Sequence, residues 1–207
     1  MDIKKMPWPA KGKRAFVEGT DMRDFQLSHF YDHTNHGSAF MDAADALMET
    51  YQAMTLYREA FFFPIAYLYR HGLELLLKDL VRIGVFLQFF KQEDVEVMLA
   101  GHPLAPLWNK ARKLIEHRFP NSDPSPIKGT EAIINQFHQD DPSGQRLRYV
   151  LSKDGAWHDH FTLPKKVDVQ NLREQMQGVH SFLTCCANSF DDEIQYRLTW
   201  QREQCQE

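Results

Sequence analysis

The segment from Pro64 to Phe90 constrains the fold more than any other part of the chain. At about 100° per residue its apolar side chains form one broad helical face and a second patch on a different side. The first face contains Ile65, Tyr69, Leu73, Leu76, Leu80 and Ile83, and the second contains Leu68, Leu75 and Phe86. Pro64 suits a first helical turn. A helix that is apolar on two sides must pack between neighbours, so the sequence predicts a mainly α fold.

A polar stripe separates these two apolar surfaces and consists of Arg70, His71, Glu74 and Lys78. The spacing allows three interpretations. The charges could form an i, i+4 ladder in solvent. They could line a semi-enclosed groove, where His71 titrates near neutral pH and Arg70 binds an anion. They could also form a buried structural ion cluster. The sequence leaves these alternatives open.

Periodicity and turn residues predict the rest of the architecture. We expect an irregular N-terminal arm over residues 1–38 and one helical domain over residues 39–207. The domain is predicted to be an up-and-down bundle of about five helices with a small β-hairpin at about residues 146–163. The predicted helices cover residues 41–63, 64–90, 105–117 and 130–139, and a last long helix runs from about residue 168 past residue 190. Asp154 and Gly155 supply the expected hairpin turn.

Composition excludes several classes of protein. The net charge of −4 gives no global field for a nucleic acid, so such binding needs a local basic patch. The 3 cysteines fit neither a disulfide framework nor a zinc knuckle, which indicates reduced thiols and a cytoplasmic location. We see no export signal and no uncharged apolar run of about 18 residues, and therefore expect no membrane span. Phosphate loops, nucleophile elbows and nucleotide fingerprints are absent, so no cofactor is predicted.

Two strings resemble bacterial members of the HEPN-like superfamily. They are Arg-His-x-x-Glu-x-x-x-Lys, from Arg70 to Lys78, and Gly-His-x-Leu-x-x-Leu-Trp, from Gly101 to Trp108. The likeness covers roughly residues 42–190 and implies an all-α bundle that forms homodimers. Many such proteins are RNA-cleaving toxins or defence components, and others are binding or regulatory modules without activity. The predicted binding groove comprises Arg70, His71, Glu74, Lys78, His102 and Arg148.

The resemblance also implies a catalytic signature, an arginine followed several residues later by a histidine near the closing helix. Three pairs have comparable spacing: Arg23 with His29, Arg112 with His117, and Arg173 with His180. Of these, only Arg173 and His180 fall in the predicted closing helix, nearly on one face. In such a pair the histidine would exchange a proton with the RNA 2′-hydroxyl or the leaving oxygen, and the arginine would stabilise the charged phosphorane without a metal.

Two further groups of side chains are candidate sites. Lys110, Arg112, Lys113 and Arg118 form the clearest basic patch, where a phosphate backbone could bind. His29, His33 and His36 are weak candidates for metal ligands, because histidines four residues apart share a face of a helix.

These features support three functional hypotheses. The leading one is a HEPN-like interaction or regulatory module without catalytic activity, related to stress or phage defence, with a protein partner. The second is a metal-independent endoribonuclease that uses an Arg and His pair. The third is a protein that binds a metal or a small ligand. An RNA or nucleotide ligand and a homodimer are the expected partners.

Overall fold

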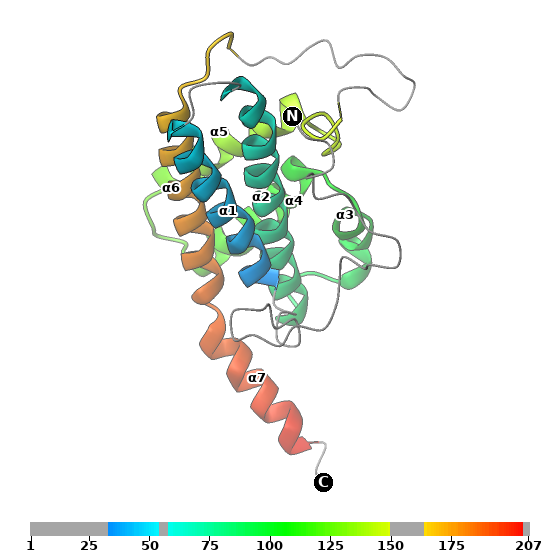
Figure 1. Cartoon of the computed structure of the whole chain (residues 1–207). Helices are drawn as coiled ribbons and strands as arrows, with labels where there is room; N and C mark the ends of the chain where they lie inside the picture. The colour runs from blue at the N-terminus through cyan, green and yellow to red at the C-terminus, as the bar shows by residue number, and fades with distance from the viewer. Residues whose placement is uncertain (1–32, 54–57, 150–163, 205–207) are drawn as a thin grey trace, which may run out of the picture. The chain divides into compact units, whose positions relative to one another are not determined.

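The computed structural model describes residues 33–53, 58–149 and 164–204, and within them it contains helices and no strand (Figure 1). The α-helices are α1 (His33–Ala53), α2 (Phe62–Phe86), α3 (Glu96–Ala100), α4 (Leu104–Arg118), α5 (Ser125–Asp140), α6 (Val169–Asn188) and α7 (Asp191–Gln204). Two 3₁₀ turns, Arg58–Phe61 and Gln92–Asp94, precede α2 and α3. All of these elements belong to the compact unit Asp32–Glu207. The expectation of a mainly α bundle is confirmed.

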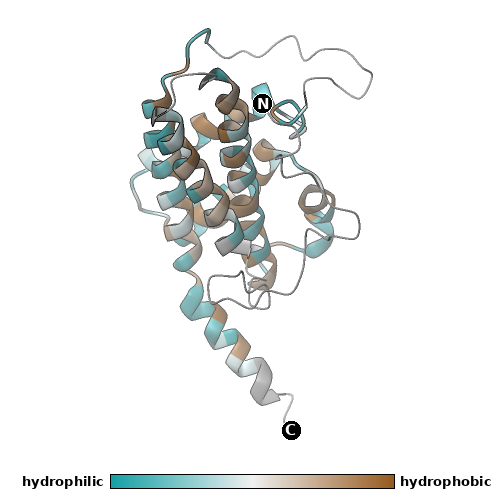
Figure 2. Cartoon of the chain, in the orientation of Figure 1, coloured by the Kyte–Doolittle hydropathy of each residue, from teal (hydrophilic) through white to brown (hydrophobic). Residues whose placement is uncertain are grey.

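The helix α2 lies at the centre of the bundle. It packs against α1, α4 and α6, while α4 also packs against α5 and α6 against α1. The broad apolar face of α2 forms the core, and Leu73, Leu77 and Leu80 are fully buried there. On its second patch, Leu68 and Phe86 are half-buried against that core. Figure 2, which colours the ribbon by hydropathy, shows hydrophobic and hydrophilic residues alternating along the helices of the bundle.

Two glycines set the close approach of α1 to α2. A Cβ atom on Gly37 would lie 2.8 Å from Leu76 Cγ, and one on Gly72 would lie 2.9 Å from the Met41 side chain. Gly37 is therefore a packing residue inside α1. The helix α1 already begins at His33, so the predicted boundary of the irregular arm at residue 38 was wrong. Residues 58–61 form a separate 3₁₀ turn, so the predicted helix over residues 41–63 does not run unbroken to residue 63.

The turn after α5 replaces the start of the predicted hairpin. Asp141 Oδ1 accepts hydrogen bonds from the backbone N–H groups of Gln145 and Arg146, at 2.7 and 3.0 Å. The Tyr149 N–H then donates to the Gln145 carbonyl at 3.0 Å. Residues 146–148 consequently form a turn, and Tyr149 after them is not in a strand. The remainder of the predicted hairpin, residues 150–163, lies outside the described residues.

The closing helix starts and stops at identifiable signals. Asp168 caps α6, because its Oδ1 accepts from the N–H groups of Gln170 and Asn171, both at 3.0 Å. The helix ends at Asn188, and Phe190 then inserts its ring into the core with 2% exposure. A separate helix, α7, follows, with acidic residues in its first turn that suit the helix dipole. The predicted closing helix is thus two helices.

In the described part of the chain, no helix combines the length and apolar character that crossing a membrane requires.

Candidate functional site

The charged stripe of α2 is buried. Arg70 and Glu74 are each 1% exposed and Lys78 is 7% exposed. Interpretation of these residues as a solvent ladder is therefore wrong, because neighbouring turns cover them. Charges removed from water are costly unless each one is paired and hydrogen-bonded. The partners that meet this requirement define the site, which we call the Arg70 cluster: Arg70, Glu74, Lys78, His102 and Asp141.

Glu74 is the acceptor at the middle of the Arg70 cluster. Its Oε1 accepts from Lys78 Nζ at 2.8 Å and lies 2.9 Å from His102 Nδ1. Its Oε2 accepts from Arg70 Nη1 at 3.2 Å. Burial raises the pKa of the Glu74 carboxyl, but the hydrogen bonds and positive charges of Lys78 and His102 outweigh burial and lower it. Glu74 is thus a carboxylate in the interior.

Arg70 connects α2 to two distant turns. Its Nη2 donates to the His102 carbonyl at 2.9 Å, and its Nε donates to the Asp141 carbonyl at 3.1 Å. Asp141 Oδ2 is 3.3 Å from the same Nε, close enough for an ion pair although the N–H points to the carbonyl. Gly144, at φ 73°, packs on the guanidinium, and a Cβ there would lie 2.8 Å from Nη1. Each guanidinium nitrogen therefore has a partner within the fold.

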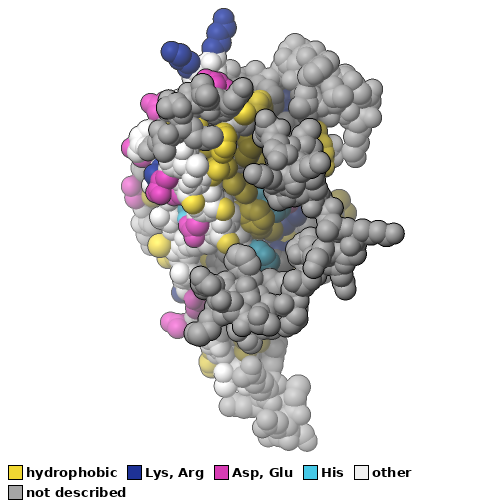
Figure 3. Space-filling model, viewed as in Figure 1, with side chains coloured by type: hydrophobic (Ala, Val, Ile, Leu, Met, Phe, Trp, Pro, Cys, Tyr) yellow, Lys and Arg dark blue, Asp and Glu magenta, His cyan; other side chains and the backbone are white. Residues whose placement is uncertain are grey.

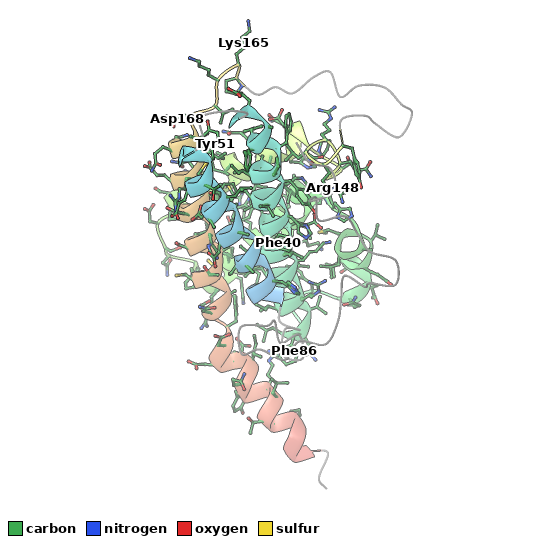
Figure 4. The ribbon with its side chains drawn as sticks, in the orientation of Figure 1. Phe40, Tyr51, Phe86, Arg148, Lys165 and Asp168 are labelled. Atoms are coloured by element: carbon green, nitrogen blue, oxygen red, sulfur yellow. The ribbon has the colours of Figure 1, made fainter. Side chains whose placement is uncertain are left out.

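His71 and Arg148 lie at the rim of the Arg70 cluster. The His71 ring packs edge-on against Phe40, with centroids 4.4 Å apart, and parallel to Tyr67 at 5.7 Å. Arg148 lies over the same Tyr67 ring, at 5.7 Å, and its Nε donates to the Gly144 carbonyl at 2.7 Å. Figure 4 labels Phe40 on α1 and Arg148 on the turn after α5. The structure thus gathers all six predicted groove residues around α2.

Burial lowers the pKa of His71. Glu74 acts in the opposite direction, while the positive charges of Arg70, Lys78 and Arg148 lower the pKa further. The imidazole is accordingly neutral near pH 7. Because no hydrogen bond to its ring nitrogens occurs among the described residues, its contacts are those of an aromatic packing residue.

Arg173 and His180 face α1 rather than the Arg70 cluster. Arg173 Nη2 donates to Glu49 Oε1 at 2.7 Å, and its Nε is 3.6 Å from Asp45 Oδ1. His180 Nε2 is 2.9 Å from the Ser38 hydroxyl. Neither residue shares a hydrogen-bond or ion-pair partner with the Arg70 cluster among the described side chains. The two predicted sites therefore do not converge.

The surroundings of Arg173 are acidic. Asp45 also accepts hydrogen bonds from the Tyr69 hydroxyl and from Gln177 Nε2, the latter at 2.6 Å. Exposed Asp42, Glu49 and Glu174 lie on the same two helices, and acidic side chains are visible along this face in Figure 3. Negative side chains compensate the arginine and would repel a phosphate.

The predicted basic patch is divided among separate environments. Arg112 pairs with Glu116 at 2.8 Å and with Glu131 at 3.0 Å. Lys110 lies over the Phe90 ring at 5.1 Å. Lys113 is exposed. Arg118 lies at the far end of α4, where its Nη2 donates to the Ser189 carbonyl at 2.8 Å. Two of the four cations, Arg112 and Arg118, are thus engaged by acceptors of the protein itself.

The predicted metal ligands fall largely beyond the structural description. His29 lies outside the described residues, as does the side chain of His33, and His36 is exposed. Across the described ranges, no group of three or more His, Cys, Asp or Glu side chains could hold a metal ion.

Sequence reasoning missed the contribution of Asp141 and Gly144 to the Arg70 cluster. Aspartate next to proline is typical of turns, and Asp141 caps its turn through the N–H groups of Gln145 and Arg146. Its ion pair with Arg70 spans 71 positions and leaves no local signal. A charge balance could have pointed to it, because two buried cations on α2 require a second carboxylate besides Glu74.

Comparison of the chain with protein-family models, curated proteins and solved structures finds no significant match in any of the three.

Proposed function

We propose that this chain is a HEPN-like bacterial interaction or regulatory module without catalytic activity. It acts in the cytoplasm as a homodimer, in a stress or phage-defence setting. The observation that carries the proposal is the saturation of the Arg70 cluster. The guanidinium of Arg70 and the carboxylate of Glu74 both spend their hydrogen bonds inside the fold. The motif residues from which the resemblance was inferred thus serve as an internal connector between α2 and two turns.

The environment of the predicted catalytic pair supports the same proposal. An arginine that stabilises a phosphorane needs an open guanidinium with its charge uncompensated. Arg173 is instead held by Glu49 and Asp45. His180 is hydrogen-bonded to Ser38 on α1, so its ring is oriented by packing between two helices. The alternative hypothesis of an endoribonuclease lacks an available arginine at this position.

The helix α7 offers a surface for the partner. Tyr196 and Trp200 are 72% and 55% exposed and lie four residues apart, which puts them on one side of the helix. Large exposed aromatic side chains are typical of protein interfaces, where they supply much of the binding energy. We therefore place the homodimer contact on this part of α7.

Sedimentation of the purified chain at micromolar concentration tests the dimer. We expect the wild type to sediment as a dimer and the Tyr196→Ser, Trp200→Ser double variant as a monomer with unchanged helical circular dichroism. Val97→Ser is the matched control, because Val97 is 87% exposed on a different helix. A dimer that survives the double substitution would place the interface elsewhere, and a monomeric wild type would contradict the homodimer.

Incubation with single-stranded RNA in EDTA tests the absence of catalysis. The wild type and His180→Ala should leave the RNA equally intact over hours. Cleavage by the wild type that His180→Ala abolishes would refute the non-catalytic module and establish the metal-independent endoribonuclease.

A further inference from the structure

A separate pocket lies where α2 and α4 end and α7 begins. Its volume is about 280 Å³. Phe190 and two leucines form an apolar floor, while the walls carry Phe89, His117, Arg118, Glu193 and Arg197. None of these residues belongs to the Arg70 cluster, and the pocket does not include Tyr196 or Trp200.

The pocket has an excess of positive charge. Arg118 and Arg197 face one carboxylate, Glu193, which pairs with Arg197 Nη2 at 3.1 Å. Arg118 donates one hydrogen bond, from Nη2 to the Ser189 carbonyl, and its guanidinium carbon lies 5.5 Å from the centroid of the Phe190 ring. Its Nε and Nη1 have no hydrogen-bond partner in the described part of the chain. A cation near the C-terminus of a helix offsets the negative end of its dipole. Arg118, although it belongs to α4, does this for α6 through the hydrogen bond from its Nη2 to the Ser189 carbonyl. The remaining donors are available to an anion.

An exposed aromatic pair adjoins these donors. The rings of Phe89 and His117 have centroids 4.9 Å apart, and Phe89 is 39% exposed. A planar ring can stack on such a surface, and base–aromatic stacking of this kind is common in nucleotide binding. Gln88 also lines the pocket, with a left-handed backbone at φ 61°, and its amide can both donate and accept a hydrogen bond.

From this juxtaposition we propose that the pocket binds a small phosphate ester with a planar ring, the chemical class of a nucleoside monophosphate. Arg118 and Arg197 hold the phosphate, and Phe89 with His117 stacks the ring. A volume of about 280 Å³ is sufficient for one such unit. The proposal goes beyond the interaction module and is tested with different variants, because neither Tyr196 nor Trp200 lines the pocket and Arg118 lies on α4.

Isothermal titration calorimetry on the full chain at low salt tests the proposal, with adenosine monophosphate as the probe. We expect saturable binding that Arg118→Gln and Arg197→Gln each weaken about tenfold, the usual scale for losing a charge-assisted hydrogen bond. Lys113→Gln is the matched control, since it removes one cation from an exposed position of α4 outside the pocket. Its affinity should stay within about twofold of the wild type.

Two further probes separate the contributions of the ring and the phosphate. Inorganic phosphate and adenosine should each bind more weakly than adenosine monophosphate. Equal affinity for inorganic phosphate would overturn the assignment of a ring-bearing ligand. Absence of binding by the wild type, or an equal loss with Lys113→Gln, would overturn the site.

The Arg197→Gln variant also controls for a folding artefact, because among the described residues Arg197 forms an ion pair only with Glu193. The unfolding midpoint of this variant should match that of the wild type.

Discussion

The Arg70 cluster and the pocket at the end of α4 are built from the same kinds of side chain, but their arginines differ in burial and in the number of hydrogen bonds they make to the protein. Arg70 is 1% exposed and meets acceptors from α2 and two distant turns. Arg118 is exposed and donates a hydrogen bond to the protein through one of its three guanidinium nitrogens. The difference lies in how many acceptors the fold brings to each arginine. Where the turns supply enough acceptors the arginine is structural, and where they do not it can bind a ligand.

A second pair sharpens this comparison at the level of sequence. Arg70 with Glu74 and Arg112 with Glu116 have identical i, i+4 spacing. The side chains of the first pair are each 2% exposed, whereas those of the second are 38% and 46% exposed. Exposed pairs contribute little because water solvates both charges, while breaking a buried pair leaves a charge without compensation. The two pairs should therefore respond very differently to the same substitution.

The largest expected effect is that of Glu74→Gln. It leaves Arg70 and Lys78 buried without their shared carboxylate, and we expect a loss of about 3 kcal/mol or more in the free energy of unfolding. Glu116→Gln is the matched control and should cost less than about 1 kcal/mol. Urea denaturation at pH 7 measures both. Similar costs for the two variants would show that burial does not distinguish these pairs.

A smaller effect is expected at Gly144. Gly144→Ala places a Cβ 2.8 Å from Arg70 Nη1 and forces alanine to φ 73°, so we expect a cost of about 2 kcal/mol. Gly129→Ala is the opposite case, because nothing lies within 4 Å of its Cβ position and it is inside α5. It should stabilise by about 0.5 to 1 kcal/mol through helix propensity. Thermal melting separates the two, and a stabilising Gly144→Ala would contradict the packing described here.

The smallest effect is the pH dependence that Glu74 confers. Its folded-state pKa is lowered, so the folded state binds fewer protons than the unfolded chain. The stability it contributes is complete above the ordinary glutamate pKa and is lost as pH falls through the lowered folded value, that is, below about pH 4. The stability gap between wild type and Glu74→Gln should narrow over this range in urea titrations. A gap that stays constant down to pH 3 would be inconsistent with a lowered pKa.

Much of the helical architecture was predictable because it depends on local periodicity. The apolar face of α2 predicted its central position, and Asp168 marked the start of α6. The beginning of α1 was missed because Gly37 resembles a turn residue until its contact with Leu76 is known. The candidate site was half predictable. Arg70, Glu74 and Lys78 were identified as a group, but Asp141 is 71 positions from Arg70, and no local pattern reports such a pairing.

The account rests on the claim that the charges of α2 are spent inside the fold, joining that helix to distant turns. A double-mutant cycle between Arg70→Met and Asp141→Asn tests it most directly, because the two residues are 1% and 0% exposed and meet only through tertiary structure. We predict a coupling free energy of unfolding of at least about 1.5 kcal/mol. If the unfolding free energies lost in the two single variants add up to that of the double variant within about 0.5 kcal/mol, the claim is contradicted. The charged residues of α2 would then be better explained as the lining of an open groove.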